Sequence, residues 1–193
     1  MKSVKHYIWK KNLLPKTVCQ QLIKGIKKQK WKKHFWYDPD QTNYISLKDK
    51  EPDVTFASEE DQSILRPYIL KALDEYQALH YPETIKKEQV QFSKNWIRFY
   101  SRIRFNRYKK GSLLRPHVDH IHDIFDGKHK GIPLVSISGQ LNNNFEGADF
   151  QIHHKTIPLK QGDILLFPSH FVYPHKVTEC HKGIRYSFIC WGF

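Results

Sequence analysis

Glycines divide the second half of this chain into short segments in which apolar and polar residues partly alternate. Aromatic and β-branched residues are frequent in these segments, a composition typical of strands. The expected strands cover residues 89–100, 102–108, 113–117, 134–141, 150–154, 164–167, 172–177 and 185–191. Many short strands of even spacing predict a closed or double-sheet β structure.

Two helices are expected before this β region. The first covers residues 14–33, where Pro15 suits a first helical turn and apolar residues recur at helical spacing. The second begins after Ser58, whose side chain can cap the helix and is followed by acidic residues, and it ends before Pro82. Residues 34–55 contain many turn formers and are expected to be irregular.

These elements together predict a mainly β fold with flanking helices, an α+β class. The helices are expected to cover one outer face of the sheet. We therefore expect a single domain over residues 1–193, with helical support in 1–88 and a β core in 89–193. A chain of this length buries roughly 70% of its unfolded surface, enough for a sizeable core.

Composition restricts the environment in which such a chain works. No apolar run approaches the roughly 20 residues that span a membrane, and the basic N-terminus lacks the features of a signal peptide. The three cysteines show no CxxC spacing, so we expect a reducing, cytoplasmic location without a disulfide framework. The formal net charge of +13 favours acidic partners, nucleic acid or protein, although a solvated lysine-rich face explains it equally.

A pair of potential metal ligands follows the expected strand 113–117. His117 and Asp119 are two residues apart, so an extended strand would send both side chains to the same side. With a second histidine they would form the two-imidazole, one-carboxylate set of non-haem iron oxygenases. The pair alone is a weak signal among twelve histidines. His117 nevertheless follows the apolar residues Leu113 and Leu114 at the end of an expected strand. The histidines of residues 120–132 lie in a polar stretch that is typical of a loop.

The motifs that surround this pair occur in a characteristic order. They are Tyr108-Lys109-Lys110-Gly111, His117-Val118-Asp119, Leu141-Asn142, Phe145-Glu146-Gly147-Ala148-Asp149-Phe150, Gly162-Asp163, the Pro-flanked His175, Gly183-Ile184-Arg185-Tyr186-Ser187 and Trp191. In this order the chain resembles the Fe(II)/2-oxoglutarate-dependent dioxygenase superfamily, and within it the prolyl 4-hydroxylase-like branch. The resemblance covers roughly residues 98–193. One departure is Gly147-Ala148, where the family commonly has two glycines.

The resemblance implies a double-stranded β-helix, or jelly-roll, with Fe(II) bound by His117, Asp119 and His175. It also implies 2-oxoglutarate as co-substrate, O2 as oxidant, ascorbate as reductant, and succinate and CO2 as co-products of a hydroxylation. Relatives that halogenate their substrates lack the carboxylate ligand, so Asp119 favours hydroxylation.

The same resemblance implies a binding site for the co-substrate. Arg185 would pair with the distal carboxylate of 2-oxoglutarate, aided by the Ser187 hydroxyl. Tyr108 and Gln140 match positions that reach the co-substrate, and Trp191 matches an aromatic residue beside the metal. Each of these side chains could instead serve only packing or a salt bridge.

Three substrate classes remain open at this point. The branch suggests a prolyl residue of a protein or peptide, and a free amino acid or other small molecule is the alternative. Nucleic acid is suggested by the net charge but not favoured, because nucleic-acid demethylases usually carry a second arginine at the position of Trp191. A jelly-roll binding module without activity is a further alternative. Residues 120–132 are expected to form a loop beside the site. The oligomeric state stays open.

Overall fold

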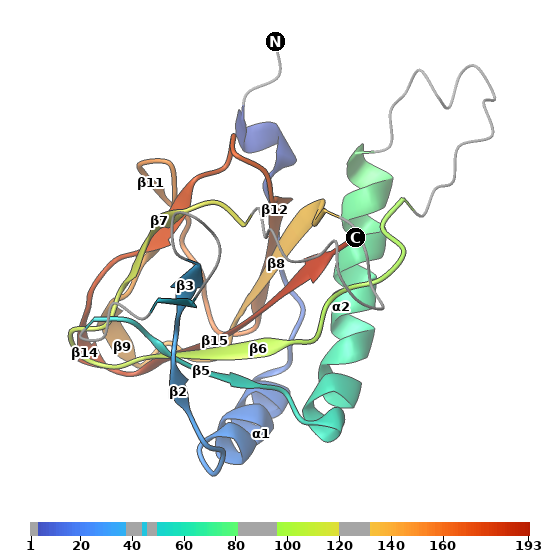
Figure 1. Cartoon of the computed structure of the whole chain (residues 1–193). Coiled ribbons are helices and arrows are strands. Elements are labelled where there is room, and N and C mark those ends of the chain that lie inside the picture. Colours follow the sequence, from blue (N-terminus) through green and yellow to red (C-terminus); the bar gives the residue numbers. More distant parts are fainter. Residues whose placement is uncertain (1–3, 38–43, 46–49, 81–95, 120–131) are drawn as a thin grey trace, which may run out of the picture.

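Two antiparallel β-sheets form the centre of the molecule, which we describe from a computed structural model (Figure 1). The structure describes residues 4–37, 44–45, 50–80, 96–119 and 132–193. Within them, the large sheet has seven strands in the order β1 (Trp9–Asn12), β12 (Asp163–Pro168), β8 (Val135–Gln140), β15 (Arg185–Gly192), β6 (Arg104–Tyr108), β5 (Asp53–Phe56) and β2 (Lys32–Lys33). The small sheet has the order β11 (Lys155–Thr156), β10 (Phe150–Ile152), β13 (His175–Val177) and β7 (Leu114–His117).

Shorter elements complete the described part of the chain. They are a 3-10 helix (Val4–Tyr7) and two strand pairs, β9 (Phe145–Gly147) with β14 (Cys180–Gly183) and β3 (Trp36–Tyr37) with β4 (Tyr44–Ile45). Strand β9 ends at Gly147, with φ 74°, and Ala148 follows with φ 49°, so both residues at this turn are in the left-handed region. A preference of the family for two glycines at this turn is therefore explained by its backbone.

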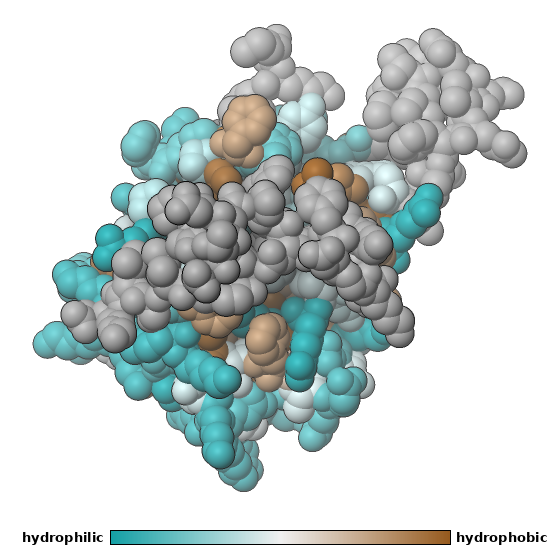
Figure 2. Space-filling model, viewed as in Figure 1, coloured by the Kyte–Doolittle hydropathy of each residue, from teal (hydrophilic) through white to brown (hydrophobic). Residues whose placement is uncertain are grey.

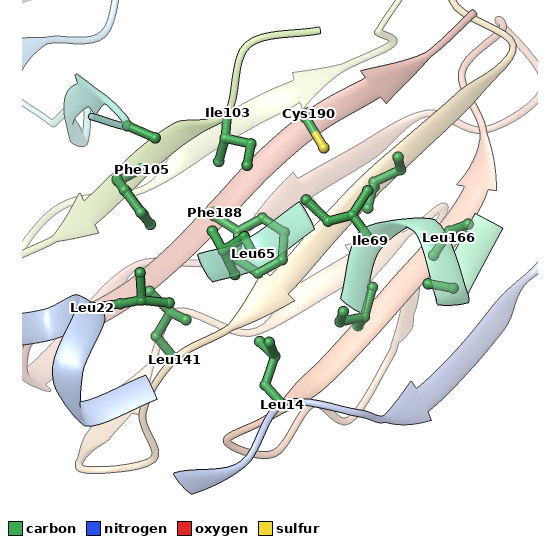
Figure 3. Packing of buried hydrophobic residues seen from close by; sticks show 14 of the residues in the cluster. Leu14, Leu22, Leu65, Ile69, Ile103, Phe105, Leu141, Leu166, Phe188 and Cys190 are labelled. Atoms are coloured by element: carbon green, nitrogen blue, oxygen red, sulfur yellow. The ribbon is translucent and has the colours of Figure 1, made fainter. Parts of the chain in front are cut away.

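Two apolar clusters hold the layers together. The first lies between the large sheet and helices α1 (Lys16–Ile26) and α2 (Glu59–His80), and includes Leu22, Leu65 and Phe188 (Figure 3). The second lies between the two sheets and includes Phe150 and Phe167. The β core and the helices on its outer face therefore agree with the expected fold class and with a jelly-roll.

The second helix matches its prediction and the first is shorter than expected. Ser58 Oγ accepts a hydrogen bond from the amide of Asp61 at 3.1 Å, which caps the start of α2. Helix α1 ends at Ile26 rather than at residue 33. The carbonyl of Ile26 accepts from the amide of Gln29 and from the indole of Trp31, both at 3.1 Å, so a tight turn and a side chain replace the partner that another helical turn would supply.

The predicted strands are mostly confirmed, with errors in the N-terminal half. Residues 34–55 were expected to be irregular, yet they contain β3, β4 and most of β5, and β1 was not predicted. Strand β5 is held by its pairing with β6, a long-range contact that local composition does not encode. Of the predicted strand 89–100, residues 89–95 lie outside the described residues, and 96–100 contribute only a bridge from Tyr100 to Gly192.

The visible surface is strongly hydrophilic around α1 and β2, in the lower part of Figure 2. Exposed lysines in this region include Lys24, Lys27, Lys28, Lys32 and Lys33. Among the described residues, no helix has both the length and the apolar character required to cross a membrane.

Candidate metal centre

The predicted triad comes together where the small sheet meets the large one. Strands β7 and β13 pair so that His117 lies directly opposite His175. Each of His117, Asp119 and His175 offers one ligand atom, and these atoms all lie within 4.8 Å of one another. Strand β7 ends at His117, so Asp119 lies beyond it. The sequence correctly predicted that these three side chains converge. They converge because two strands pair, and not because residues alternate along one strand.

Both imidazoles are oriented by backbone carbonyls. His117 Nδ1 lies 2.7 Å from the carbonyl oxygen of Arg115, and His175 Nδ1 lies 3.1 Å from that of Tyr173. Because a carbonyl can only accept, each Nδ1 carries the proton and each Nε2 is left with a free lone pair. The two Nε2 atoms face Asp119, at 3.5 Å from Oδ1 for His117 and 3.5 Å from Oδ2 for His175.

Asp119 is a buried carboxylate with a fixed orientation. Its Oδ2 accepts a hydrogen bond of 2.6 Å from the Ser136 hydroxyl, which also lies 2.9 Å from the hydroxyl of Ser169. Burial alone would raise the pKa of Asp119, but His175, His117 and Ser136 outweigh it and hold the pKa well below its usual range. The carboxylate is therefore ionised at neutral pH.

The charge state of the histidines completes the test of fit for a metal. Burial lowers the pKa of His175 to about 4, with smaller effects from Asp119 and His117. His175 is thus neutral at pH 7, and three lone-pair donors converge on one point. Two imidazoles and one carboxylate in this arrangement suit Fe(II), and three side chains leave further coordination positions open for other ligands. The donor set fits iron.

Arg185 lies inside the same barrel, at the start of β15. It is only 2% exposed, and its Nε donates to Gln140 Oε1 at 2.8 Å. Its Nη1 is buried and has no hydrogen-bond partner among the described residues. Arg185 and Gln140 line a cavity of about 210 Å³. An unpaired guanidinium that faces a cavity is suited to a carboxylate ligand.

This cavity is connected to the metal ligands through a side chain in its wall. Phe150 lines the cavity, and its ring stacks on the imidazole of His175 with centroids 5.5 Å apart. The unpaired guanidinium and the metal ligands therefore belong to one site.

The remaining predicted residues also lie in this interior. The ring of Tyr108 lies 5.2 Å below the Arg185 guanidinium, and Ser187 is 1% exposed opposite Gln140 on β8. Trp191 is opposite Ser136, so it lies beside the strand position that binds Asp119. The structure brings all eight predicted residues into one site. Their individual roles stay predictions.

Several residues of this site were missed by sequence reasoning. Ser136 orients the carboxylate ligand, and Trp36 packs edge-on against His117 with ring centroids 5.0 Å apart. Arg104 places its guanidinium 5.5 Å from the Trp191 ring. No motif marks these residues, because only strand pairing shows which of them face the interior. The predicted loop 120–132 lies outside the described residues except for Ile132.

Comparison with known proteins gives the class of this fold and site. Residues 103–193 match the family model described as the 2OG-Fe(II) oxygenase superfamily. A PKHD-type hydroxylase of Idiomarina loihiensis is 32% identical over 95 residues, which cover 47% of this chain and 41% of that protein. The match thus spans less than half of that relative's length. Residues 103–193 are thus similar to the 2OG-Fe(II) oxygenase superfamily, and the matched part is 47% of this chain in the comparison with the hydroxylase.

Solved structures with the same fold cover nearly all of the chain. A prolyl hydroxylase of Trichoplax adhaerens, in complex with a hypoxia inducible factor peptide fragment, has a TM-score of 0.66 at 15% identity, covering 97% of this chain and 84% of that one. A prolyl-4-hydroxylase of Pseudomonas putida has a TM-score of 0.65 at 15% identity, covering 97% and 92%. The viral collagen prolyl hydroxylase of Paramecium Bursaria Chlorella virus-1, solved with 2-oxoglutarate, has a TM-score of 0.61 at 17% identity, covering 96% and 94%.

Proposed function

We propose that this protein is an Fe(II)- and 2-oxoglutarate-dependent hydroxylase. The observation that carries the proposal is the presence, in one barrel, of three convergent metal ligands and a buried arginine whose Nη1 has no partner among the residues that the structure describes. When bound, iron would supply the activation of oxygen that couples oxidation of 2-oxoglutarate to hydroxylation of a C–H bond. A binding module without activity would not need both halves of this arrangement.

The protein's own groups orient the reactants. The carbonyls of Arg115 and Tyr173 fix the tautomers of the two histidines, so both Nε2 atoms face the metal position. Gln140 holds the Arg185 side chain by its Nε and leaves Nη1 for the distal carboxylate of 2-oxoglutarate. The rings of Phe150 and Phe167 pack against the His175 imidazole and would exclude water from that side of the ligand.

A prolyl residue of a protein or peptide is the substrate that we propose. Support comes from the motif order in the sequence and from the prolyl hydroxylases among the structures with this fold. A free amino acid remains the alternative, and nucleic acid stays a prediction from net charge alone.

Release of labelled CO2 from 1-¹⁴C-2-oxoglutarate, with Fe(II) and ascorbate, tests the class of reaction. We expect slow release without added substrate, and its loss in His117→Ala and Asp119→Ala because each removes a metal ligand. His154→Ala is the matched control, since His154 is exposed and outside the site. Release that persists in both ligand variants would contradict the proposal. Mass spectrometry of proline-containing peptides after incubation, for a gain of one oxygen, tests the substrate.

A further inference from the structure

A second arginine faces the interior of the barrel, at the opposite end of β6 from Tyr108. Strand β6 alternates between two environments: Arg104, Asn106 and Tyr108 point to the inside, whereas Phe105 lies in the cluster under the helices. Arg107 points outward and its guanidinium binds the Asp53 carboxylate at 2.8 and 3.0 Å. Arg104 is thus an inward-facing cation on a strand whose other arginine is paired.

Arg104 has no anionic partner in the described part of the chain. Neither a hydrogen bond nor an ion pair involves its guanidinium there, and its Nε is buried without a partner. The side chain is half-buried, and its neighbour is the ring of Trp191 at 5.5 Å, an attraction too weak to replace the hydration that the buried Nε has lost. An unpaired guanidinium at such a position is costly unless a ligand supplies the missing acceptors.

The position of Arg104 is beside the metal centre. Trp191 is opposite Ser136, and the Ser136 hydroxyl binds Asp119. Burial lowers the pKa of Arg104, while the charges of Tyr108 and Asp119 act in the opposite direction. Asp119 does not satisfy the arginine, because its oxygens already face Ser136, His117 and His175.

The charges of the site leave room for one more anion. With a divalent metal and the dianion 2-oxoglutarate bound, the metal and the guanidinium groups of Arg104 and Arg185 would carry four positive charges against three negative ones, counting Asp119, so one positive charge would lack a counterpart among these groups. The nearby carboxylate of Glu51 has its own cation, Arg115, at 3.5 Å. The guanidinium of Arg185 would bind the distal carboxylate of the co-substrate. The guanidinium of Arg104 is the one that remains.

From this placement we propose that Arg104 binds a carboxylate of the molecule that is oxidised, and so determines substrate specificity. The inference rests on the proposed function and narrows its substrate class to compounds that carry a carboxylate close to the oxidised carbon. Two sources share this chemistry: the α-carboxylate of a free amino acid, and an acidic side chain next to a prolyl residue. A neutral internal prolyl segment would leave Arg104 unpaired.

The guanidinium Nε–Hε resonance of Arg104 reports directly on its partner. The sample is the full chain labelled with ¹⁵N-arginine and loaded with Zn(II) and 2-oxoglutarate, which cannot turn over, and Arg104→Lys assigns the resonance. Titration with acetate, the smallest carboxylate, should shift this resonance to saturation, whereas acetamide should not. Arg104→Gln should weaken acetate binding about tenfold or more, as expected for loss of a charge-assisted hydrogen bond. Arg102→Gln, at an exposed position two residues earlier, should leave acetate binding unchanged.

Matched substrates then distinguish the source of the carboxylate. Preference for L-proline over L-prolinamide would assign a free amino acid, and preference for acetyl-Pro-Asp-amide over acetyl-Pro-Asn-amide would assign an acidic neighbour. The proposal is overturned if acetate causes no shift, if acetamide shifts the resonance equally, if 2-oxoglutarate alone saturates it, or if neither matched pair is discriminated. Because this titration needs no turnover, it stands apart from the CO2 assay, whose failure would remove the proposed function alone.

Discussion

The two faces of the large sheet are made by alternate residues of the same strands but differ in kind. Toward the helices, β6, β8 and β15 present Phe105, Ile137 and Phe188, which are all fully buried and apolar. Toward the small sheet, the same strands present residues that are buried but polar, namely Asn106, Ser136, Ser138, Gln140, Arg185 and Ser187. One set of strands therefore carries a hydrophobic core on one side and a chemical site on the other.

The difference teaches where stability and function are located. Burial of apolar side chains is the dominant favourable contribution to folding, whereas buried polar groups contribute little net stability and are costly when unpaired. Among the described residues, buried side-chain atoms without partners on these strands, such as Arg185 Nη1 and Asn106 Oδ1, all lie on the inner face. We expect changes on the helix-facing side to reduce stability and changes on the inner side to reduce binding.

The largest expected effect is on the helix-facing side, at Phe188. Its ring lies against Gly139, which has no side chain, so position 139 offers nothing to fill the space that removal of the ring leaves. Phe188→Ala should lower the free energy of unfolding by about 3–5 kcal/mol, measured by urea denaturation. Ser187→Ala, one residue away on the inner face, is the control and should change stability by less than about 1 kcal/mol. Equal losses in both variants would refute the division between the faces.

At Arg185, on the inner face, we expect a loss of binding and not of stability. Arg185→Gln should weaken 2-oxoglutarate binding by about 2–4 kcal/mol, because a charge-assisted contact to the distal carboxylate is lost. Isothermal titration of the Zn(II)-loaded protein measures this affinity, and Zn(II) binding itself should be retained. Arg107→Gln removes an arginine of the opposite face and should leave co-substrate affinity unchanged. Unaltered 2-oxoglutarate affinity in Arg185→Gln would remove this residue from its proposed role.

The inner face was only partly predictable from the sequence. His117, Asp119, His175 and Arg185 could be named because their order along the chain is characteristic. Arg104 could not, because it lies within three residues of Arg102 and Arg107, and nothing local separates an arginine that faces the barrel from an exposed or paired one. Which of them faces the barrel depends on the register of β6 against β15, a long-range property.

The fold could be predicted where strand-like segments recur along the sequence. The prediction failed where tertiary contacts determine whether a segment forms a strand or ends a helix. Alternation located β8, an apolar run located β12, and the glycine-bounded segment 185–191 located β15, each to within two residues. Strand β1 was missed because its residues, Trp9-Lys10-Lys11-Asn12, become a strand by pairing with the edge of β12. Helical periodicity also extended the prediction past the end of α1, because the spacing of apolar residues does not show the turn through Gln29 and the Trp31 side chain that close the helix.

The smallest expected effect is a difference in metal affinity between variants of two serines that lie on the same strand and the same face. Ser136 donates to Asp119, whereas Ser138, two residues further along β8, has no hydrogen bond to a metal ligand. Ser136→Ala should weaken Fe(II) or Zn(II) binding about tenfold, because a carboxylate without its orienting partner loses ordering and a stabilising hydrogen bond. Ser138→Ala should leave metal affinity unchanged, and both variants should unfold at nearly the wild-type urea concentration. Competition with a fluorescent chelator measures the affinities. If both serines proved equivalent, orientation of Asp119 would not depend on Ser136, and the inner face would act on the metal only through its three ligands.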